Sequence, residues 1–298
     1  MADTIFPIAD SQFRHKNVNL IRQVTELKAW VKENRSFPKT IGVVPTMGAL
    51  HEGHLSLVKA SLAKADVTLV TIFLNPTQFG NHEDLDKYPH NLDQDLQKLA
   101  DIGPMTVFAP PVDEIYPIGF STGVTPPQIA KTLEGEKRPT HFAGVATVVL
   151  KLLNLSQADY AFFGQKDYQQ QLVVRQMVRD LNSPTEIVVC PIVREPDGLA
   201  MSSRNAYLSP EQRKIALVLH QTLDYADRQV REGCRDSFEL IVDMRQMLID
   251  GGVDQVDYAV IADPETLETP DHIDSNVVAL LAAYVGQTRL IDNRLIEI

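Results

Sequence analysis

The sequence has 298 residues, of which 44% are hydrophobic and 22% are charged, and its formal net charge is −11. This composition is ordinary for a globular protein, and at roughly 150 residues per domain the length favours two domains. The negative charge argues against a nucleic-acid partner, because such binding neutralises many phosphates with basic side chains. The longest uncharged apolar run, residues 277–285, is well short of the ~20 residues that a membrane helix needs, so no membrane partner is expected.

The N-terminus and the cysteines indicate where the protein works. Residues 1–4, MADT, do not begin a basic segment followed by a long apolar stretch, which a secretory signal requires. Cys190 and Cys234 are too few for a disulfide framework or a cysteine zinc site, and free thiols are typical of a reducing compartment. We therefore expect a cytoplasmic protein.

The first predicted strand, residues 41–44, runs into the segment PTMGALHEGH at residues 45–54, and a helical pattern follows over residues 55–65. His51 and His54 are three residues apart and share one face of the first helical turn. Unpaired backbone N–H groups and the positive end of the helix dipole favour anions there. The segment is typical of a strand, a turn and a helix start that hold a phosphate group.

Further apolar segments alternate with helical patterns along the chain. Strands are predicted at residues 67–74, 105–109, 160–163 and 186–193. Their continuous apolar character and the helices between them predict a doubly wound α/β fold with a parallel sheet. In such sheets ligands bind beyond the carboxyl ends of the strands, where residues 75–79 and 164–167 are also placed.

The last of these strands is followed by a polar loop, DGLAMSSRN, at residues 197–205. The hydroxyls of Ser202 and Ser203 and the guanidinium of Arg204 are donors suited to a polyphosphate. Together with Lys166 and the two histidines, they form a local cluster of donors in an otherwise acidic chain. This combination indicates a small anionic ligand.

The remainder of the chain has a different pattern. The segment SPEQ at residues 209–212 predicts the capped start of a long helix, and a second helix is expected from about Asp236 to Gly251. Strands are predicted at residues 256–261, 277–285 and 289–298. We expect residues 1–193 to form a Rossmann-like domain and residues 194–298 to form a small α+β domain that carries the Met-Ser-Ser-Arg loop.

Six separated segments closely resemble, in order, the motifs of the pantothenate synthetase family, also called pantoate–β-alanine ligases. They are PTMGALHEGH (45–54), IFLNPTQF (72–79), RPTHF (138–142), FGQKDYQQ (163–170), GLAMSSRN (198–205) and RLIDN (289–293). The resemblance implies the nucleotidyltransferase version of the Rossmann-like fold and a homodimer. It also implies that ATP activates (R)-pantoate as pantoyl adenylate, that β-alanine then displaces AMP, and that Mg²⁺ accompanies ATP.

The resemblance also implies roles for individual residues. Those expected to bind ATP are Met47, Gly48, Ala49, Leu50, His51, Glu52, Gly53, His54, Gly164, Gln165, Lys166, Asp167, Val193, Met201, Ser202, Ser203 and Arg204. Those expected to act in catalysis are His51, His54, Lys166, Ser202, Ser203 and Arg204. Those expected to bind the substrate are Asn75, Gln78, Arg138 and Gln170. Asp95 and Glu134 are the candidate magnesium ligands.

Two positions depart from the family pattern, since Gln165 stands where glutamate is usual and His90 where arginine is common. They leave open the contacts around the ribose. No role is assigned to His82, His90 or His141, and His220 is interpreted as a partly buried packing residue. Zinc is not expected at HEGH, because a helical zinc pair is normally four residues apart and needs a third protein ligand.

Two other functions remain as alternatives. An adenylyltransferase of the same fold would need further positive charge for a phosphorylated acceptor, whereas Asn75, Gln78 and Gln170 are neutral. A nucleotide-binding regulator without catalytic activity could dispense with donors such as Lys166 and Arg204, which are present. Without the resemblance, Gln170 would indicate only a polar helix start on the surface.

Overall fold

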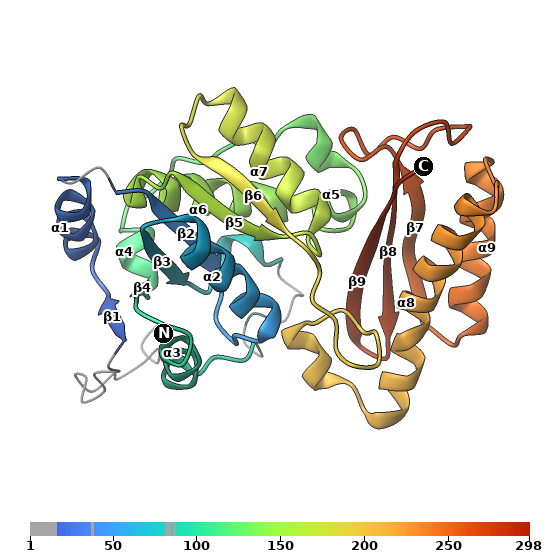
Figure 1. Cartoon of the computed structure of the whole chain (residues 1–298), viewed down its shortest axis with the longest axis horizontal. Coiled ribbons are helices and arrows are strands. Elements are labelled where there is room, and N and C mark those ends of the chain that lie inside the picture. The colour runs from blue at the N-terminus through green and yellow to red at the C-terminus, as the bar shows by residue number, and fades with distance from the viewer. Residues whose placement is uncertain (1–16, 37–38, 81–84, 86–87) are drawn as a thin grey trace.

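Two sheets organise the chain, one parallel and one antiparallel (Figure 1). The structure is a computed structural model that describes residues 17–36, 39–80, 85 and 88–298. We call residues 17–190 the parallel-sheet unit, residues 191–209 the linking segment and residues 210–296 the C-terminal unit. The prediction of a Rossmann-like α/β fold with a smaller C-terminal α+β part is confirmed.

The parallel sheet has the strand order β1-β4-β3-β2-β5-β6. Its strands are β1 Val18–Ile21, β2 Ile41–Thr46, β3 Val67–Ile72, β4 Met105–Phe108, β5 Tyr160–Gly164 and β6 Glu186–Cys190. The sequence pattern does not predict β1, because its four residues alternate in exposure and lack a continuous apolar run. The predicted range of the last strand, residues 186–193, is longer than β6, because Pro191 has no N–H group to continue the ladder.

Helices cover both faces of this sheet, as its apolar strands require. On one face lie α1 Val24–Arg35, α6 His141–Ser156 and α7 Tyr168–Asp180, and on the other lie α2 Glu52–Lys64 and α3 Leu92–Ala100. Shorter helical turns are η1 Pro76–Gln78, α4 Val112–Ile115, η3 Gln128–Lys131, α5 Glu134–Lys137 and η4 Ser203–Tyr207. Adjacent residues of β2 serve the two cores, since Val43 packs on the α6 side and Val44 on the α2 side.

The strand order reverses beside β2. From β2 the chain continues to β3 and β4 on one side, and it later returns to place β5 and β6 on the other side. The segments that leave β2 and β5 therefore diverge and open a crevice at the carboxyl end of the sheet. This crevice is the expected place for a ligand in a doubly wound fold.

The C-terminal unit contains α8 Pro210–Arg231, α9 Ser237–Asp250, β7 Gln255–Ala262, β8 Val277–Val285 and β9 Thr288–Ile296. The predicted helix start is confirmed by a capping box, in which Ser209 Oγ accepts from Gln212 N at 3.2 Å and Ser209 N donates to Gln212 Oε1 at 2.9 Å. The two helices cover one face of the sheet and share a core with it. The domain boundary at residues 193 and 194 stays a prediction.

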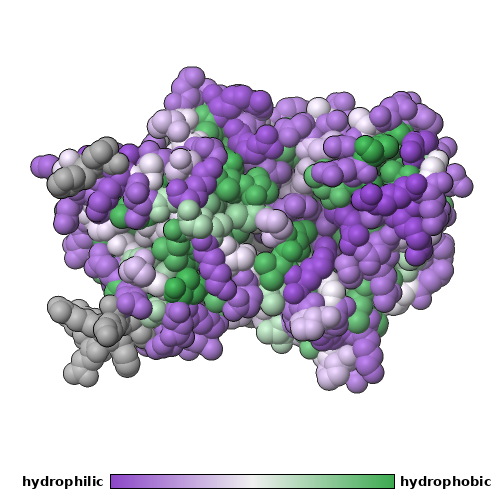
Figure 2. Space-filling model, viewed as in Figure 1, coloured by the Kyte–Doolittle hydropathy of each residue, from purple (hydrophilic) through white to green (hydrophobic). Residues whose placement is uncertain are grey.

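The other face of the antiparallel sheet packs on the parallel-sheet unit. Tyr168 and Leu172 of α7 contact an apolar cluster that includes Leu280 and Ala282 of β8. Figure 2 shows hydrophobic residues near the middle of the visible face, between the two units, and mostly hydrophilic residues around them. Within the described ranges, no helix is long and apolar enough to cross a membrane.

A buried charged cluster joins the two units beside this apolar contact. Arg289 of β9 donates to Glu134 Oε1 at 2.7 Å and to Oε2 at 2.9 Å, and it also donates to Asp257 at 2.7 Å. The hydroxyl of Tyr258 donates to Glu134 Oε1 at 2.7 Å. Burial alone would raise the pKa of Glu134, but the hydrogen bonds and the charge of Arg289 bring it below its ordinary value. Glu134 is therefore ionised, and besides these partners from the C-terminal unit it lies 3.8 Å from Nη1 of Arg138.

The Arg289→Met substitution would leave the Glu134 carboxylate buried without its main partner. Since breaking a buried ion pair from one side typically costs ~3–5 kcal/mol, we expect the free energy of unfolding to fall by about that amount at pH 7. Urea unfolding measures it. The matched control is Arg175→Met, because Arg175 pairs with Glu265 in an exposed position and such pairs contribute about 1 kcal/mol or less. Equal losses in the two variants would contradict the expectation.

Candidate active site

The turn after β2 has a backbone shape that its sequence allows. Gly48 has φ +86° and Ala49 has φ +51°, so two successive residues lie in the left-handed region. A β-carbon at Gly48 would come within 3.2 Å of Asp95 Oδ2, which leaves little room for a side chain. The Gly48 N–H donates to Thr46 Oγ1 at 3.3 Å, and the Thr46 hydroxyl donates to Thr71 O at 2.7 Å. The turn is thus tied to β3.

Helix α3 holds the same turn from behind. Asp95 Oδ1 accepts from the Leu50 N–H at 2.8 Å, and Lys98 Nζ donates to the Leu50 carbonyl oxygen at 2.6 Å. Both backbone polar groups of Leu50 are therefore satisfied by one turn of α3. Lys98 is not among the residues that the sequence predicted for the site.

The two histidines begin α2 and lie side by side. His51 caps the helix, its Nδ1 accepts from the Gly53 N–H at 3.2 Å, and the ring centroids of His51 and His54 are 4.1 Å apart. Burial, followed by the charge of Lys166, lowers the pKa of His51 to about 4. Burial and the neighbouring His51 lower the pKa of His54 well below its ordinary value. Both rings are therefore neutral at pH 7, and His51 has a proton on Nε2 to donate.

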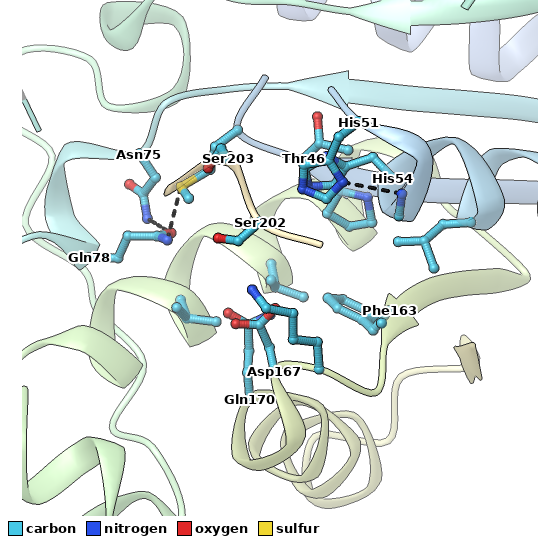
Figure 3. Close-up of a pocket in the computed structure, with 18 of the residues that line it drawn as sticks. Thr46, His51, His54, Asn75, Gln78, Phe163, Asp167, Gln170, Ser202 and Ser203 are labelled. Carbon is cyan, nitrogen blue, oxygen red and sulfur yellow. Dashed lines mark hydrogen bonds between the residues drawn. The ribbon is translucent and has the colours of Figure 1, made fainter. Parts of the chain in front are cut away.

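The opposite wall of the pocket comes from the end of β5 and the start of α7. Lys166, Asp167 and Gln170 lie there, and Figure 3 shows Asp167 and Gln170 across the pocket from the two histidines. Burial and the charge of Arg204 lower the pKa of Lys166, while Asp167 opposes that change. The two walls lie on the two sides of the strand-order reversal.

Two neutral amides form a third side of the pocket. Asn75 is almost fully buried, and its Nδ2 donates to Gln78 Oε1 at 3.0 Å (Figure 3). Its Oδ1 accepts from the Tyr116 hydroxyl at 2.9 Å. Gln78 Nε2 lies 3.1 Å from Met47 Sδ. Because its oxygen already accepts from Asn75, Gln78 presents its NH₂ group as a donor toward the pocket. A carboxylate or a hydroxyl oxygen fits such a donor.

His141 lines the pocket beside these amides, although the sequence analysis gave it no role. Its Nδ1 donates to the Gln78 carbonyl oxygen at 3.0 Å, and its Nε2 lies 3.2 Å from Nη1 of Arg138. The ring therefore links Arg138 to η1. The available signal was the spacing of three residues between Arg138 and His141 at a helix start.

The linking segment reaches over the pocket. Met201 N donates to Val193 O at 3.0 Å, Ser202 Oγ accepts from Arg204 N at 3.2 Å, and the Ser203 hydroxyl donates to the Tyr88 hydroxyl at 3.3 Å. The last contact joins the segment to Tyr88 of the parallel-sheet unit, which also lines the pocket. The loop is thus positioned to cover a ligand.

The structure brings most of the predicted site residues together. Those that line the pocket are Met47, His51, Gly53, His54, Asn75, Gln78, Arg138, Gly164, Lys166, Asp167, Gln170, Val193, Met201, Ser202, Ser203 and Arg204. Those outside its lining are Gly48, Ala49, Leu50, Glu52 and Gln165, of which Glu52 pairs with Lys59 at 3.4 Å. Thr46, Phe73, Tyr88 and His141 are pocket residues that the sequence analysis did not identify.

The assignment of Asp95 and Glu134 as magnesium ligands stays a prediction, and the structure shows both in internal contacts. Asp95 is 2% exposed and holds Leu50 from behind the turn, while both oxygens of Glu134 accept from Arg289. Across the described ranges, no group of three or more His, Cys, Asp or Glu side chains is arranged to hold a metal ion. His82 lies outside the described residues. His220 packs against Gly198, as its interpretation as a packing residue requires.

Comparison with known proteins identifies the family. The family described as Pantoate-beta-alanine ligase matches residues 19–295. The chain belongs to this family. A relative from Thermotoga neapolitana called pantothenate synthetase is 49% identical over 279 residues, which cover 94% of this chain and 100% of the relative. A second from Rhodopirellula baltica, with the same name, is 52% identical over 274 residues, which cover 91% and 96%.

Solved structures of ligases in this family have the same fold. The pantothenate synthetase of Thermus thermophilus superposes with a TM-score of 0.87 at 42% identity, covering 93% of this chain and 98% of that one. The pantoate-β-alanine ligase of Francisella tularensis, described as complexed with β-γ ATP and β-alanine, superposes with a TM-score of 0.78 at 36% identity, covering 93% and 97%.

The neutral state of His51 predicts a pH dependence of stability. In the unfolded chain histidine takes up a proton near pH 6.5, whereas folded His51 stays neutral down to about pH 4. The unfolded state then binds more protons between these values, so this residue lowers the free energy of unfolding as the pH falls from 7 to 5. We expect His51→Gln to lose less stability than the parent over that interval in urea unfolding. His272→Gln, at an exposed site, should follow the parent; a His51→Gln curve parallel to the parent would refute the assignment.

Proposed function

We propose that this protein condenses (R)-pantoate with β-alanine to form pantothenate, and that it converts ATP to AMP and pyrophosphate in doing so. The observation that carries the proposal is one pocket with phosphate donors on two walls and neutral amides on the third. Family membership supports the reaction, and the Francisella tularensis relative supports ATP and β-alanine as ligands.

In the first step a pantoate carboxylate oxygen attacks the α-phosphorus of ATP. The new O–P bond gives pantoyl adenylate, and the bond from that phosphorus to pyrophosphate breaks. Transfer at phosphorus needs mainly positioning and stabilisation of charge on the equatorial and leaving oxygens. His54, Lys166 and Arg204 provide donors for those oxygens, while Gln78 and Gln170 bind pantoate without adding charge beside the phosphates.

In the second step the β-alanine amine attacks the acyl carbon, the C–N bond forms, the proton leaves the amine and AMP departs. Water would compete for the same acyl adenylate, so the pocket has to exclude it between the steps. The loop at residues 201–204 and its contact from Ser203 to Tyr88 are placed to provide that cover. Ser202 and Ser203 also offer hydroxyl donors to the phosphate tail.

Magnesium enters this proposal as a companion of ATP. Asp95 and Glu134 are engaged in internal contacts, so no carboxylate pair of this chain is assigned to the ion. When bound, Mg²⁺ would neutralise charge on the phosphates, and it commonly keeps several waters while doing so. We also propose a cytoplasmic location, because ATP is abundant there and both cysteines are free.

A homodimer is the proposed assembly. The support is the family resemblance and a group of exposed large apolar side chains around α4, in which Val112 is 45% exposed, Ile118 fully exposed and Phe120 37% exposed. These three side chains lie within residues 112–120, and clustered exposed apolar side chains are typical of a protein contact.

The reaction is tested by pyrophosphate release with ATP, Mg²⁺ and one substrate at a time. Pantoate alone should give a single turnover, and adding β-alanine should give continuous release with AMP and pantothenate detected by mass. Omitting Mg²⁺ should suppress both the single turnover and the continuous release of pyrophosphate. His54→Ala should slow the first turnover on the order of a hundredfold, since one transition-state donor is worth ~3 kcal/mol.

The control for that variant is His272→Ala, at an exposed site outside the pocket lining. Circular dichroism checks that both variants fold. Unchanged release by His54→Ala would remove that residue from the catalytic set. Absence of any pantoate-dependent release, with ATP still bound, would favour an adenylyltransferase with another acceptor or a regulator.

Sedimentation equilibrium tests the dimer. We expect twice the mass of one chain for the parent and one chain mass for Ile118→Asp, because a charge in an apolar contact is costly to bury. Leu295→Asp is the control, since Leu295 is 39% exposed on another surface. A monomeric parent would refute the dimer, and a dimeric Ile118→Asp variant would place the contact elsewhere.

A further inference from the structure

Asn293 of β9 uses its whole side-chain amide on the turn that carries Lys166. Its Nδ2 donates to the carbonyl oxygens of Gln165 at 3.0 Å and of Lys166 at 2.9 Å. Its Oδ1 accepts from Gln165 Nε2 at 3.2 Å. Asn293 is 2% exposed, so these bonds form away from water. A residue of the C-terminal unit therefore fixes the backbone of a pocket residue of the parallel-sheet unit.

Asp292, the residue before Asn293, makes a second contact of this kind, which reaches the linking segment. Asp292 accepts from Arg194 in a bidentate pair at 2.6 Å and 3.0 Å, and Arg194 also donates to Gly198 O at 3.1 Å. Arg194 pairs with Ala200 in an isolated bridge, immediately before the loop at residues 201–204. Asp292 and Asn293 thus hold the linking segment and the turn that carries Lys166, and both of these segments line the pocket.

The strand geometry explains why two consecutive residues can do this. In β9, Asp292 is paired with Leu281, which belongs to the core under α8 and α9. Asn293 is paired with Leu280, which belongs to the cluster on α7. Because successive side chains of a strand point to opposite faces, the two residues reach the two segments from one edge strand.

The position of the Lys166 ammonium depends on this backbone. Lysine has a flexible four-carbon stem and binds phosphate as a point charge, so its location is set mainly by where its backbone is held. The turn is also tied to β6, where Gln165 N donates to Cys190 O at 2.8 Å. That bond fixes the N–H side of the turn, whereas Asn293 fixes the two carbonyl groups.

We propose that Asn293 is a positioning residue for Lys166, through which the C-terminal unit sets where the ammonium meets the phosphates of ATP. The proposal rests on the role proposed above for Lys166. It also accounts for Gln165, whose amide donates to Asn293 Oδ1 and leaves both Asn293 N–H groups for the carbonyls.

The first test compares Asn293→Asp with Asn276→Asp. The first variant keeps the acceptor for Gln165 but replaces two donors with a carboxylate that faces two carbonyl oxygens. Asn276 lies in the same unit and its Oδ1 accepts from Ile298 N at 3.1 Å, so its substitution keeps that bond with the same change of charge. Single-turnover adenylate formation at saturating ATP and pantoate should fall about tenfold to a hundredfold for Asn293→Asp, as small misplacements of catalytic groups do, and stay unchanged for Asn276→Asp.

The decisive test is a double-mutant cycle with Lys166→Met, using Asn293→Ala to avoid the added charge. If Asn293 acts through Lys166, Asn293→Ala slows adenylate formation in the parent but changes the rate less than about twofold once Lys166 is absent. A role in general stability would instead multiply the two losses. Circular dichroism and thermal unfolding check each variant, and Asn293→Asp takes the place of Asn293→Ala in the cycle if the latter does not fold.

The outcomes separate this proposal from the proposed function. If Lys166→Met slows adenylate formation but Asn293→Ala does not, the positioning role is overturned and the role of Lys166 stays intact. The same follows if the rate losses of the two substitutions multiply in the double variant. If Lys166→Met forms the adenylate at the parent rate, both the positioning role of Asn293 and the role proposed for Lys166 are overturned. Non-multiplying losses support the positioning role.

Discussion

The reversal of strand order beside β2 is the constraint on which the pocket depends. Because β3 and β5 flank β2 on opposite sides, the segments that leave β2 and β5 cannot cover one another. The histidine pair comes from the first segment and Lys166 from the second, so these groups face each other across the opening. A helix start lies at each wall, and its N–H groups add to the attraction for anions.

The structural features that the sequence predicts correctly depend on local patterns of residues. Five strands of the parallel sheet, the capped start of α8 and the meeting of motifs at one sheet edge depend on neighbouring residues and on a general rule for parallel sheets. Contacts across long stretches of chain were not predictable in this way. Lys98 donates to the Leu50 carbonyl oxygen, and Asn293 donates to the Lys166 carbonyl oxygen. The sequence around neither side chain indicates which residue is its partner.

The same distinction applies to the contacts of the two candidate magnesium ligands, Asp95 and Glu134. Both oxygens of Glu134 accept from Arg289, whereas Asp95 uses Oδ1 for Leu50 N and its buried Oδ2 has no hydrogen-bond partner. Arg289, which captures Glu134, comes from β9 at the far end of the chain. Both carboxylates therefore serve the architecture around the pocket through partners that are distant in the sequence.

Pairing of this kind also explains how a chain with net charge −11 can bind a polyanion. Buried carboxylates close to the pocket are matched to cations or backbone N–H groups: Glu134 to Arg289, Asp292 to Arg194 and Asp95 to Leu50. Since the two histidines are neutral, the cationic side chains that line the pocket are Lys166, Arg204 and Arg138, of which Arg138 also lies 3.8 Å from Glu134. The amides of Asn75, Gln78 and Gln170 line the same pocket without adding charge.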